Sequence, residues 1–390
     1  MASQQDIQDR QIWIMAGEPS GDRYGADVAQ ALLRRDPSLQ LRGMGGGQMR
    51  TAGVELLADV SDLAVVGFVE VLRHLPRFVH VFRDLVQRAR REKPATAVLI
   101  DNPGFNLRMA RTLHRMHIPV VYYVSPQVWA WGRRRIPKMA HNVNRLLTIF
   151  PFEPDVFADT RLDVRFVGHP LLGILEQYRN EEAQRSSSTV LLLPGSRTAE
   201  IESLLPDFLD AADILYARNP SLRFVLCVPP GHAADLAIDI AARHRAAAES
   251  TTPVDVEPGH ALSWMQRAAA GMAASGTVTL EAAILGLPLV TGYRLNTWTY
   301  RWARRLVKLP YFTIVNLVAE RPVFAEYLQD QVQPDALADG LEQILPGGAR
   351  RAETLAGMKD AVARLGPGRD VAGEVADSVL EIADRNPTRQ

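Results

Sequence analysis

The sequence has a single cysteine, Cys227, and contains no long uninterrupted apolar run. One cysteine cannot form an internal disulfide, which fits a reducing compartment, and its place in the apolar run RFVLCV predicts a buried side chain rather than a nucleophile. No segment approaches the length of about 18 apolar residues that a spanning helix needs. The polar N-terminus also lacks the pattern of a secretory signal. These absences predict a cytoplasmic protein that would meet a membrane only from one side.

Neither sign of charge is in excess, because 44 Lys and Arg residues balance 44 Asp and Glu residues. The protein therefore has no overall positive charge that would attract nucleic acid, and its sequence contains no recognised nucleic-acid-binding motif. The sequence also lacks HExxH, CxxC, a Walker loop and the Asp-x-Asp pair that metal-dependent sugar-nucleotide transferases use. We therefore expect no metal, no other cofactor and no nucleic-acid partner.

A chain of 390 residues is too long for one ordinary core, and its short β-rich runs alternate with helical patterns. This alternation predicts an α/β protein with doubly wound parallel sheets. The polar break at 180–189 indicates two Rossmann-like domains, at 1–180 and 186–349, with helical residues 350–390 completing the first. The predicted strands are 12–16, 96–100, 120–124, 146–150 and 165–169, then 189–193, 223–228, 254–257, 271–275 and 288–293.

Each half opens with a strand, a loop of small residues and a helix, namely IWIMAGEPSGD and TVLLLPGSRTAEI. Ligands of open α/β sheets bind beyond the carboxyl ends of the strands, so we expect a cleft between two facing domains. The first loop carries glycines at 17, 21 and 25, a spacing that differs from the GxGxxG of dinucleotide sites. Glu18 and Ser20 in this loop are better suited to sugar hydroxyls than to phosphate.

The second half has the pattern of a nucleotide site in SGTVTLEAA. Here a strand ends at Ser275, and the free N–H groups of Gly276 and Thr277 at a helix start favour a phosphate. Glu281, one turn later, is placed to reach a ribose, and Arg197 of the PGSR loop could clamp a diphosphate. The alternatives are a solvated glutamate and a surface arginine.

Asp101 follows an apolar strand directly, where a carboxylate could take a proton from an alcohol nucleophile. The alternative is an N-cap for the next helix, a role that Asn102 could fill instead. His169 ends another strand and fits either the cleft or a core position.

Residues 121–145 mix aromatic and basic side chains. Gln127, Trp129 and Trp131, followed by Arg133–Arg135 and Lys138, suit a phosphorylated sugar, although a solvated basic helix face is the alternative. Residues 64–83 and 298–312 combine apolar and basic residues in a way that suits an anionic membrane surface, or else an internal amphipathic helix. The expected lipid contacts are Val66, Phe68, Val69 and Leu72.

Taken together, these motifs resemble one family, the lipid-A-disaccharide synthases, in the family's order and over nearly the whole chain. SGTxTLE is shared with other GT-B glycosyltransferases, whereas AGEPSGD and SPQVWAW are much more specific. Pro19 is a mild departure, because a small residue is common there. The motifs are AGEPSGD (16–22), SPQVWAWGRRR (125–135), FVGHP (166–170), LLPGSR (192–197), SGTVTLEAAILGLPLV (275–290) and IVNLVAERPVFAEYLQ (314–329).

The resemblance implies a GT-B fold and an inverting, metal-independent transfer from UDP-2,3-diacylglucosamine to 2,3-diacylglucosamine 1-phosphate. It implies an enzyme peripherally bound to the inner face of a Gram-negative inner membrane, and it leaves an oligomer open. Asp101 matches the family's general base. Arg197, Ser275, Thr277 and Glu281 fall in the UDP-binding half, and Glu18, Ser20, Gln127 and Asn316 match polar residues implicated in activity.

Two other functions remain open on the sequence alone. One is another GT-B enzyme, such as a UDP-N-acetylglucosamine epimerase or a different glycolipid transferase, which would share the 275–281 loop. The other is a non-catalytic nucleotide-sugar binding protein at the membrane, which would bind UDP without releasing it from a sugar.

Overall fold

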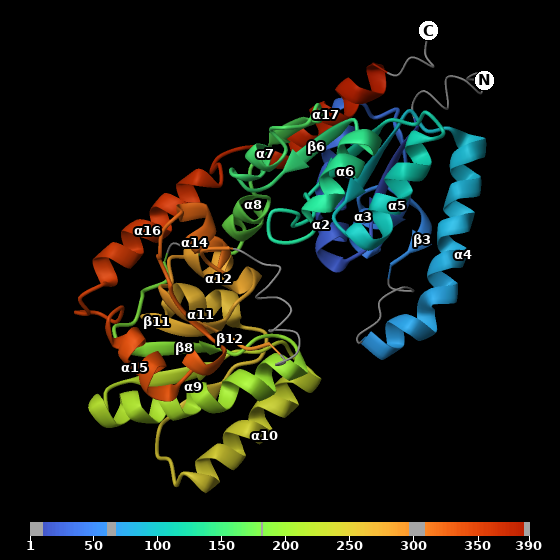
Figure 1. The fold of residues 1–390 in the computed structure, drawn as a ribbon. Helices are drawn as coiled ribbons and strands as arrows, with labels where there is room; N and C mark the ends of the chain where they lie inside the picture. The colour runs from blue at the N-terminus through green and yellow to red at the C-terminus, as the bar shows by residue number, and fades with distance from the viewer. Residues whose placement is uncertain (1–10, 61–67, 181, 296–308, 386–390) are drawn as a thin grey trace. The chain divides into compact units, whose positions relative to one another are not determined.

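The computed structural model describes residues 11–60, 68–180, 182–295 and 309–385, with the helix but not the side chains described over 68–76 (Figure 1). Two compact units divide this chain, the first formed by Met1–Pro170 and Gly368–Gln390 and the second by Leu171–Pro367. Each unit is a parallel sheet covered on both faces by helices, which confirms the predicted doubly wound α/β class.

The first unit holds a sheet of strand order β3-β2-β1-β4-β5-β6-β7 among its described residues. Its strands are β1 Gln11–Ala16, β2 Gln40–Gly45, β3 Glu55–Asp59, β4 Thr96–Ile100, β5 Val120–Tyr123, β6 Arg145–Thr148 and β7 Asp163–Phe166. Its helices are α2 Pro19–Arg35, α3 Gly47–Thr51, α4 Phe68–Glu92, α5 Pro103–His114, η1 Arg133–Arg135, α6 Ile136–Asn142, α7 Glu153–Val156 and α17 Val371–Asp384.

The second unit holds a sheet of strand order β10-β9-β8-β11-β12-β13, again in its described part. Its strands are β8 Thr189–Leu193, β9 Arg223–Leu226, β10 Val254–Val256, β11 Ala270–Ala274, β12 Leu289–Tyr293 and β13 Ala325–Leu328. Its helices are α8 Leu171–Glu176, α9 Thr198–Arg218, α10 His232–Ala247, α11 Ala261–Arg267, α12 Thr277–Ile284, α14 Ile314–Ala319, η2 Gln329–Gln331, α15 Pro334–Glu342 and α16 Arg351–Arg364.

Each unit has its own apolar core. In the first, Trp13, Leu99 and Tyr122 of the sheet pack with α4, α5 and α6 and are fully buried. In the second, α9, α10 and α15 cover one face of the sheet, and Figure 1 shows α9 and α10 side by side beneath it. Continuous apolar strands are therefore buried on both faces, as parallel sheets require.

The ten predicted strands are all present, two of them with the predicted bounds and the others with ends shifted by at most three residues. Three further strands, β2, β3 and β13, escaped prediction. β2 (QLRGMG) contains two glycines and an arginine, while β3 (ELLAD) and β13 (AEYL) are short and carry acidic residues. These strands lie at or beside the sheet edges, and none of them contains the continuous apolar run that marks a buried strand.

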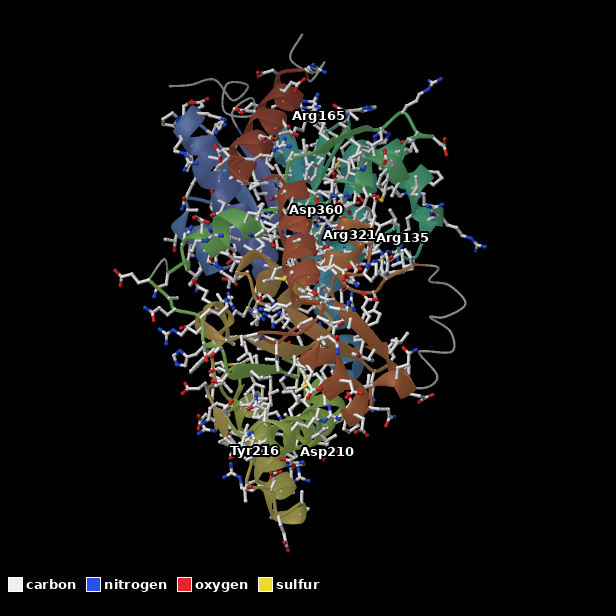
Figure 2. All side chains as sticks on the ribbon, turned by 90° about the vertical axis from the view of Figure 1, so that its left-hand side faces the viewer. Arg135, Arg165, Asp210, Tyr216, Arg321 and Asp360 are labelled. Atoms are coloured by element: carbon white, nitrogen blue, oxygen red, sulfur yellow. The ribbon has the colours of Figure 1, made fainter. Side chains whose placement is uncertain are left out.

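The two C-terminal helices go to different units, whereas the sequence placed all of 350–390 with the first domain. α16 packs on α12 and α14 of the second unit, and Asp360 on it lies 3.2 Å from Arg321, an ion pair whose residues are labelled in Figure 2. The unit boundaries accordingly fall at Pro170 and Pro367, against the expected 180 and 349.

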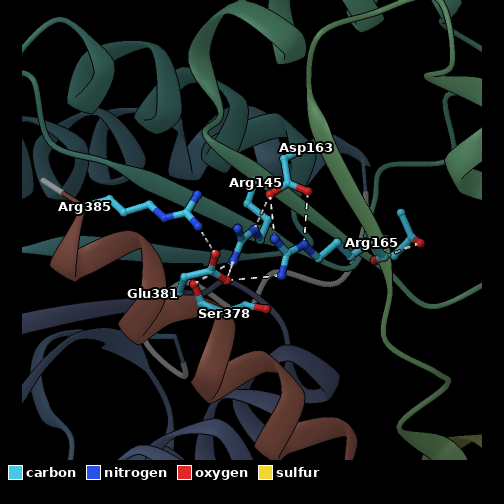
Figure 3. A network of polar contacts seen from close by, with 7 residues as sticks. Arg145, Asp163, Arg165, Ser378, Glu381 and Arg385 are labelled. Carbon is cyan, nitrogen blue, oxygen red and sulfur yellow. Dashed lines mark hydrogen bonds and ion pairs between the residues drawn. The ribbon is translucent and has the colours of Figure 1, made fainter.

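α17 returns to the first unit and is tied there by a buried arginine (Figure 3). Arg145 of β6 is fully buried; its Nη1 lies 2.6 Å from Glu381 and its Nε 2.7 Å from Asp163. Arg165 joins the same two carboxylates at 3.1 and 3.2 Å. Removing either acid would leave a buried guanidinium undercompensated, so this network holds α17 against the sheet.

Candidate active site

The predicted loops flank the point in each sheet where the strand order reverses. In the first sheet, β1 and β4 are neighbours at that point, and AGEPSGD follows β1 while Asp101 follows β4. In the second, β8 and β11 are neighbours, and PGSR follows β8 while Ser275 follows β11. Because chains diverge above and below the sheet at such a point, it is where open α/β sheets bind ligands.

The AGEPSGD loop packs directly against the turn that follows β4. A side chain at Gly17 would place its Cβ 1.7 Å from Asn102 Nδ2, so a larger residue would displace the Asn102 side chain. Pro19 then occupies the first turn of α2, where it removes an N–H group, and the Glu18 side chain does not cap the helix. Glu18 and Ser20 are exposed. This loop therefore presents a carboxylate and a hydroxyl and lacks the full set of N–H groups of a phosphate loop.

Asp22, the last residue of the motif, has a structural role that the sequence reasoning missed. It is 5% exposed, and its carboxylate accepts hydrogen bonds from the backbone N–H groups of Gly46 (2.6 Å), Gln48 (3.0 Å) and Met49 (3.1 Å). It thereby satisfies the first N–H groups of α3 and binds that helix to α2. The sequence did contain a signal for this role, because Asp22 is an acidic residue on the face of α2 that is otherwise buried.

Asp101 sits in a strained turn that buried side chains hold in place. Its φ is 45° and that of Asn102 is 42°, which are left-handed values that non-glycine residues adopt rarely. The Asp101 carbonyl accepts hydrogen bonds from the Tyr122 hydroxyl (2.6 Å) and from Nδ2 of the fully buried Asn106 (3.0 Å). Such over-determined strain is characteristic of functional sites.

The Asp101 carboxyl has a pKa well above that of an ordinary aspartate. Burial, and to a smaller extent the negative charge of Glu18, together raise its pKa to about 6 against the opposing effect of a hydrogen bond from the Asn102 backbone. The capping alternative fails, because α5 begins at Pro103 with Asn102 at its N-cap and no side chain caps it. Asp101 therefore has one backbone hydrogen bond, does not cap α5, and has a pKa suited to proton transfer.

Trp129 of the SPQVWAW motif is held in place by a buried carboxylate. Its Nε1 donates to Oε1 of Glu153 (3.2 Å), while Glu153 Oε2 accepts from the N–H groups of Ile149 (3.1 Å) and Phe150 (3.0 Å). Burial raises the pKa of Glu153 to about 7, and its three hydrogen bonds counter that rise. This leaves Trp129 half-buried and Gln127 exposed on the same loop.

His169 is a core residue rather than part of a site. It is 4% exposed and its ring lies 5.2 Å from that of Phe150. Burial lowers its pKa to about 3, so it stays neutral at physiological pH. Cys227 is also buried, and burial raises the pKa of its thiol to about 12, which confirms the expected inert side chain.

The second unit has a cavity of about 450 Å³ at its switch point. Its walls include every residue predicted to bind the donor. They are the PGSR loop, the end of β11 and the first turns of α12, and the lining residues among these are Gly195, Ser196, Arg197, Glu200, Ala274, Ser275, Gly276, Thr277, Val278 and Glu281. Its size fits a nucleotide.

Glu200 closes the PGSR loop from within. Its carboxylate accepts hydrogen bonds from the N–H groups of Ser196 (3.1 Å) and Arg197 (3.3 Å), and Arg197 Nη1 lies 2.7 Å from the other oxygen. Gly195 has φ 115° and lies against this carboxylate, which a Cβ would strike. The Arg197 side chain is 81% exposed, so its guanidinium can turn to an anion at low cost.

The start of α12 combines orphan N–H groups with a half-buried acid. Gly276 is the N-cap, and no side chain caps this helix. Glu281 lines the cavity, and burial raises its pKa. The Ser275 hydroxyl donates to the carbonyl of Phe312 (3.4 Å), which joins the loop to the segment before α14.

Asn316, which the sequence placed among the sugar-site residues, is held inside the second unit by hydrogen bonds. It is fully buried; its Nδ2 donates to the Phe324 carbonyl and Glu326 Oε1 (both 2.9 Å), and its Oδ1 accepts from two backbone N–H groups. Glu326 Oε1 also accepts from Thr313 N (2.8 Å). The pair therefore positions the segment that contacts Ser275, a role visible only once β13 is placed.

The predicted lipid contacts fall outside what the structure describes. Val66 lies outside the described residues, and the side chains of Phe68, Val69 and Leu72 lie outside them too, although their backbone begins α4. Among the described helices, none is long and apolar enough to cross a membrane. No group of three or more His, Cys, Asp or Glu in the described part of the chain is arranged to hold a metal ion.

Known proteins resemble this chain in both fold and sequence. Solved structures of similar fold include a UDP-GlcNAc 2-epimerase from Neisseria meningitidis bound to UDP-GlcNAc (TM-score 0.60, 11% identity, 95% of this chain and 100% of that one). The calicheamicin glycosyltransferase CalG4 is also similar (TM-score 0.59, 16% identity, 97% and 99%). These likenesses confirm the predicted GT-B architecture.

Sequence comparison resolves the family. A lipid-A-disaccharide synthase from Solibacter usitatus is 38% identical over 384 residues, covering 97% of this chain and 98% of the relative. One from Myxococcus xanthus is 37% identical over 381 residues, covering 95% and 97%. The family model described as lipid-A-disaccharide synthetase matches residues 12–374. The chain therefore belongs to the lipid-A-disaccharide synthetase family of glycosyltransferases.

Proposed function

We propose that this chain transfers a diacylglucosamine from UDP-2,3-diacylglucosamine to 2,3-diacylglucosamine 1-phosphate, forming a β-1,6-linked disaccharide 1-phosphate and UDP without a metal ion. The family membership supports the reaction class. The observation that carries the mechanism is the Asp101 carboxylate, which lies at a switch point and has a pKa raised to about 6.

Asp101 acts as the general base. It accepts the proton of the acceptor's 6-hydroxyl as that oxygen attacks the anomeric carbon of the donor, and the bond from that carbon to the diphosphate breaks on the opposite face. A single displacement of this kind inverts the anomeric configuration. The strained, hydrogen-bonded turn at Asp101 and Asn102 fixes the carboxylate before the substrate arrives.

The second unit binds UDP and stabilises its departure. Arg197 turns from Glu200 to the diphosphate, and the N–H groups of Gly276 and Thr277 at the start of α12 donate to it. Ser275 adds its hydroxyl, and Glu281 accepts hydrogen bonds from the ribose. The negative charge that develops on the leaving group is thereby met by an arginine and a helix N-terminus.

The first unit binds the acceptor sugar and meets the membrane. Glu18, Ser20 and Gln127 are exposed polar groups near the Asp101 loop or on the SPQVWAW loop, and Trp129 offers an aromatic face. The acyl chains of both substrates begin in a bilayer, so we assign the contact with the anionic inner face of the inner membrane to Val66, Phe68, Val69 and Leu72.

The test supplies both acylated glucosamines to the purified chain and follows disaccharide and UDP with and without EDTA. The proposal predicts equimolar disaccharide and UDP at a rate that EDTA leaves unchanged. Binding of UDP without any disaccharide would overturn the transfer reaction and favour a binding protein. Conversion of the donor sugar to an epimer would favour an epimerase, and loss of turnover in EDTA would overturn metal independence.

A further inference from the structure

A second cavity, of about 310 Å³, lies between α5 and α6 of the first unit. Four of the side chains that line it are cationic, Arg108 and Arg111 from α5, Arg135 from η1 and Lys138 from α6. Arg135 is labelled in Figure 2, and its guanidinium lies 4.6 Å from the ring centre of Trp131, at the end of the SPQVWAW segment. The sequence pattern grouped Arg135 and Lys138 with residues that suit a phosphorylated sugar, but the proposed function gives none of the four cations a role.

No carboxylate balances these charges in the described part of the chain. No Asp or Glu occurs in the sequence between Asp101 and Glu153, and none of the four cations belongs to an ion pair formed by the described residues. The guanidinium of Arg108 donates to the carbonyl of Gly104, one turn earlier in α5. Like charges gathered around one hollow repel each other, and an anion placed among them relieves that repulsion.

The remaining walls of the cavity are apolar. Ala110 and Met139 are 1% exposed, Val143 is 5% exposed, and Leu107 is half-buried. Asn142 adds an amide, which donates to the Lys138 carbonyl at 2.6 Å. A hollow with an apolar floor and a cationic rim fits an anionic group carried on an amphiphilic body better than it fits a free ion.

The cavity begins beside the proposed base. Its first residues are Pro103 and Gly104, which open α5 immediately after Asp101 and Asn102. Each turn of α5 then advances by about 5.4 Å, so Arg108 and Arg111 lie one to two turns farther from the base. A sugar whose hydroxyl faces Asp101 would direct the substituent on the far side of its ring along this helix.

We propose that this cavity binds the phosphate monoester of the acceptor, with Arg108, Arg111, Arg135 and Lys138 as its ligands. The inference rests on the proposed function and deepens it, because it states how the enzyme distinguishes a phosphorylated acceptor from an unphosphorylated one. Guanidinium and ammonium groups form charge-assisted hydrogen bonds with phosphate oxygens, and Arg does so in a bidentate manner.

The test compares two acceptors that differ only in the 1-phosphate, using wild type and the double variant Arg111→Ala/Lys138→Ala. Two lost charge-assisted hydrogen bonds should raise KM for the phosphorylated acceptor by about 10- to 100-fold. The KM for the unphosphorylated acceptor, the KM for the donor and the affinity for UDP should stay unchanged. Arg115→Ala is the matched control, because this exposed arginine follows α5 outside the cavity.

A second measurement, the equilibrium binding of each acceptor to the same proteins, tests the inference even if no turnover is observed. Wild type should bind the phosphorylated acceptor more tightly, and the double variant should lose that preference while its melting temperature stays that of the Arg115→Ala control. If disaccharide forms and the phosphate preference persists in the double variant, the inference fails while the proposed function stands. If no disaccharide forms and binding shows the same pattern, the site stands and the proposed function fails.

A third arm separates the acceptor's phosphate from a membrane lipid headgroup. Wild type and the double variant are sedimented with vesicles of neutral phosphatidylcholine, with and without anionic phosphatidylglycerol. The inference predicts equal sedimentation of both proteins. A double variant that loses anionic vesicles but keeps its phosphate preference would assign the cavity to the membrane surface and overturn the inference.

Discussion

Asp101 is the residue on which the proposed chemistry depends, and its neighbours explain its behaviour. Burial disfavours its ionised form, and Glu18 adds a like charge, so its pKa rises to about 6 from an ordinary value near 3.8. Because the folded pKa is raised, the contribution of this group to stability falls as the pH rises from about 3.8 to about 6 and stays low above that. The fold therefore keeps this carboxylate buried at a cost in stability.

The pH profile of turnover should report this carboxyl group. A base acts only when deprotonated, so kcat/KM should rise about tenfold per pH unit below pH 6 and level off above it. Glu18→Gln removes the neighbouring negative charge and should move the midpoint to lower pH. Profiles of wild type and Glu18→Gln over pH 4.5 to about 9 check both statements, and an unmoved midpoint would contradict the coupling.

Asp22 stabilises the fold by accepting hydrogen bonds at the start of α3. Asp22→Ala removes one acceptor from three backbone N–H groups, two of them in buried contacts, and should lower the free energy of unfolding by about 3 kcal/mol. Asp84→Ala breaks only a surface ion pair with Arg88 and should cost less than about 0.5 kcal/mol. Urea denaturation measures both, and equal losses would refute the capping role of Asp22.

Among the elements, the two switch points concentrate the candidate site. Loops after β1 and β4 carry Glu18 and Asp101, and loops after β8 and β11 carry Arg197 and Ser275. Each loop lies where a strand ends and a helix begins, so the same βα pattern presents acidic groups in one sheet and an arginine and a hydroxyl in the other.

Arg197→Ala should weaken UDP binding by about tenfold, because it removes a bidentate partner of the diphosphate while the helix N-terminus of α12 remains. Arg218→Ala, at the opposite end of α9, is the matched control and should leave UDP affinity unchanged. Equilibrium binding of UDP to both variants gives the answer. An Arg197→Ala protein that binds UDP like wild type would remove Arg197 from the site.

The sequence predicted these elements where local pattern and burial agree. The apolar runs of β1, β4, β8 and β11 have no polar interruption, and the loops after them hold small or charged residues that no core position explains. The hydrogen bonds of Asn316 could not be predicted, because Glu326 belongs to β13, a strand too short and polar to predict, and Phe324 directly precedes that strand. The PGSR loop was predicted, but its closure by Glu200 depends on the left-handed turn at Gly195.

At the scale of the molecule, each unit is a complete α/β layer structure, and the chain returns to the first unit through α17. The buried Arg145 and its two carboxylate partners, Asp163 and Glu381, hold α17 against the sheet of the first unit. The sequence could not predict this network, because each of these residues looks like an ordinary surface charge. Residues 64–83 were predicted to lean on anionic lipid, and part of that segment lies outside the described residues.

Membrane binding should depend on that segment. Val66→Glu/Phe68→Glu introduces two negative charges at the expected apolar contact and should release the protein from anionic vesicles without unfolding it. Ile238→Glu, at a side chain 48% exposed on α10, is the control and should leave vesicle binding unchanged. Sedimentation with phosphatidylglycerol vesicles measures both, and continued binding of the double variant would refute the contact.

The most direct test of the central claim replaces the proposed base and measures disaccharide. Asp101→Ala should reduce formation of the disaccharide 1-phosphate from the two acylated glucosamines by at least about 100-fold, the contribution typical of a general base. UDP affinity should stay at the wild-type value, because the cavity proposed to bind UDP lies in the second unit. Near-normal disaccharide formation by Asp101→Ala would contradict the mechanism.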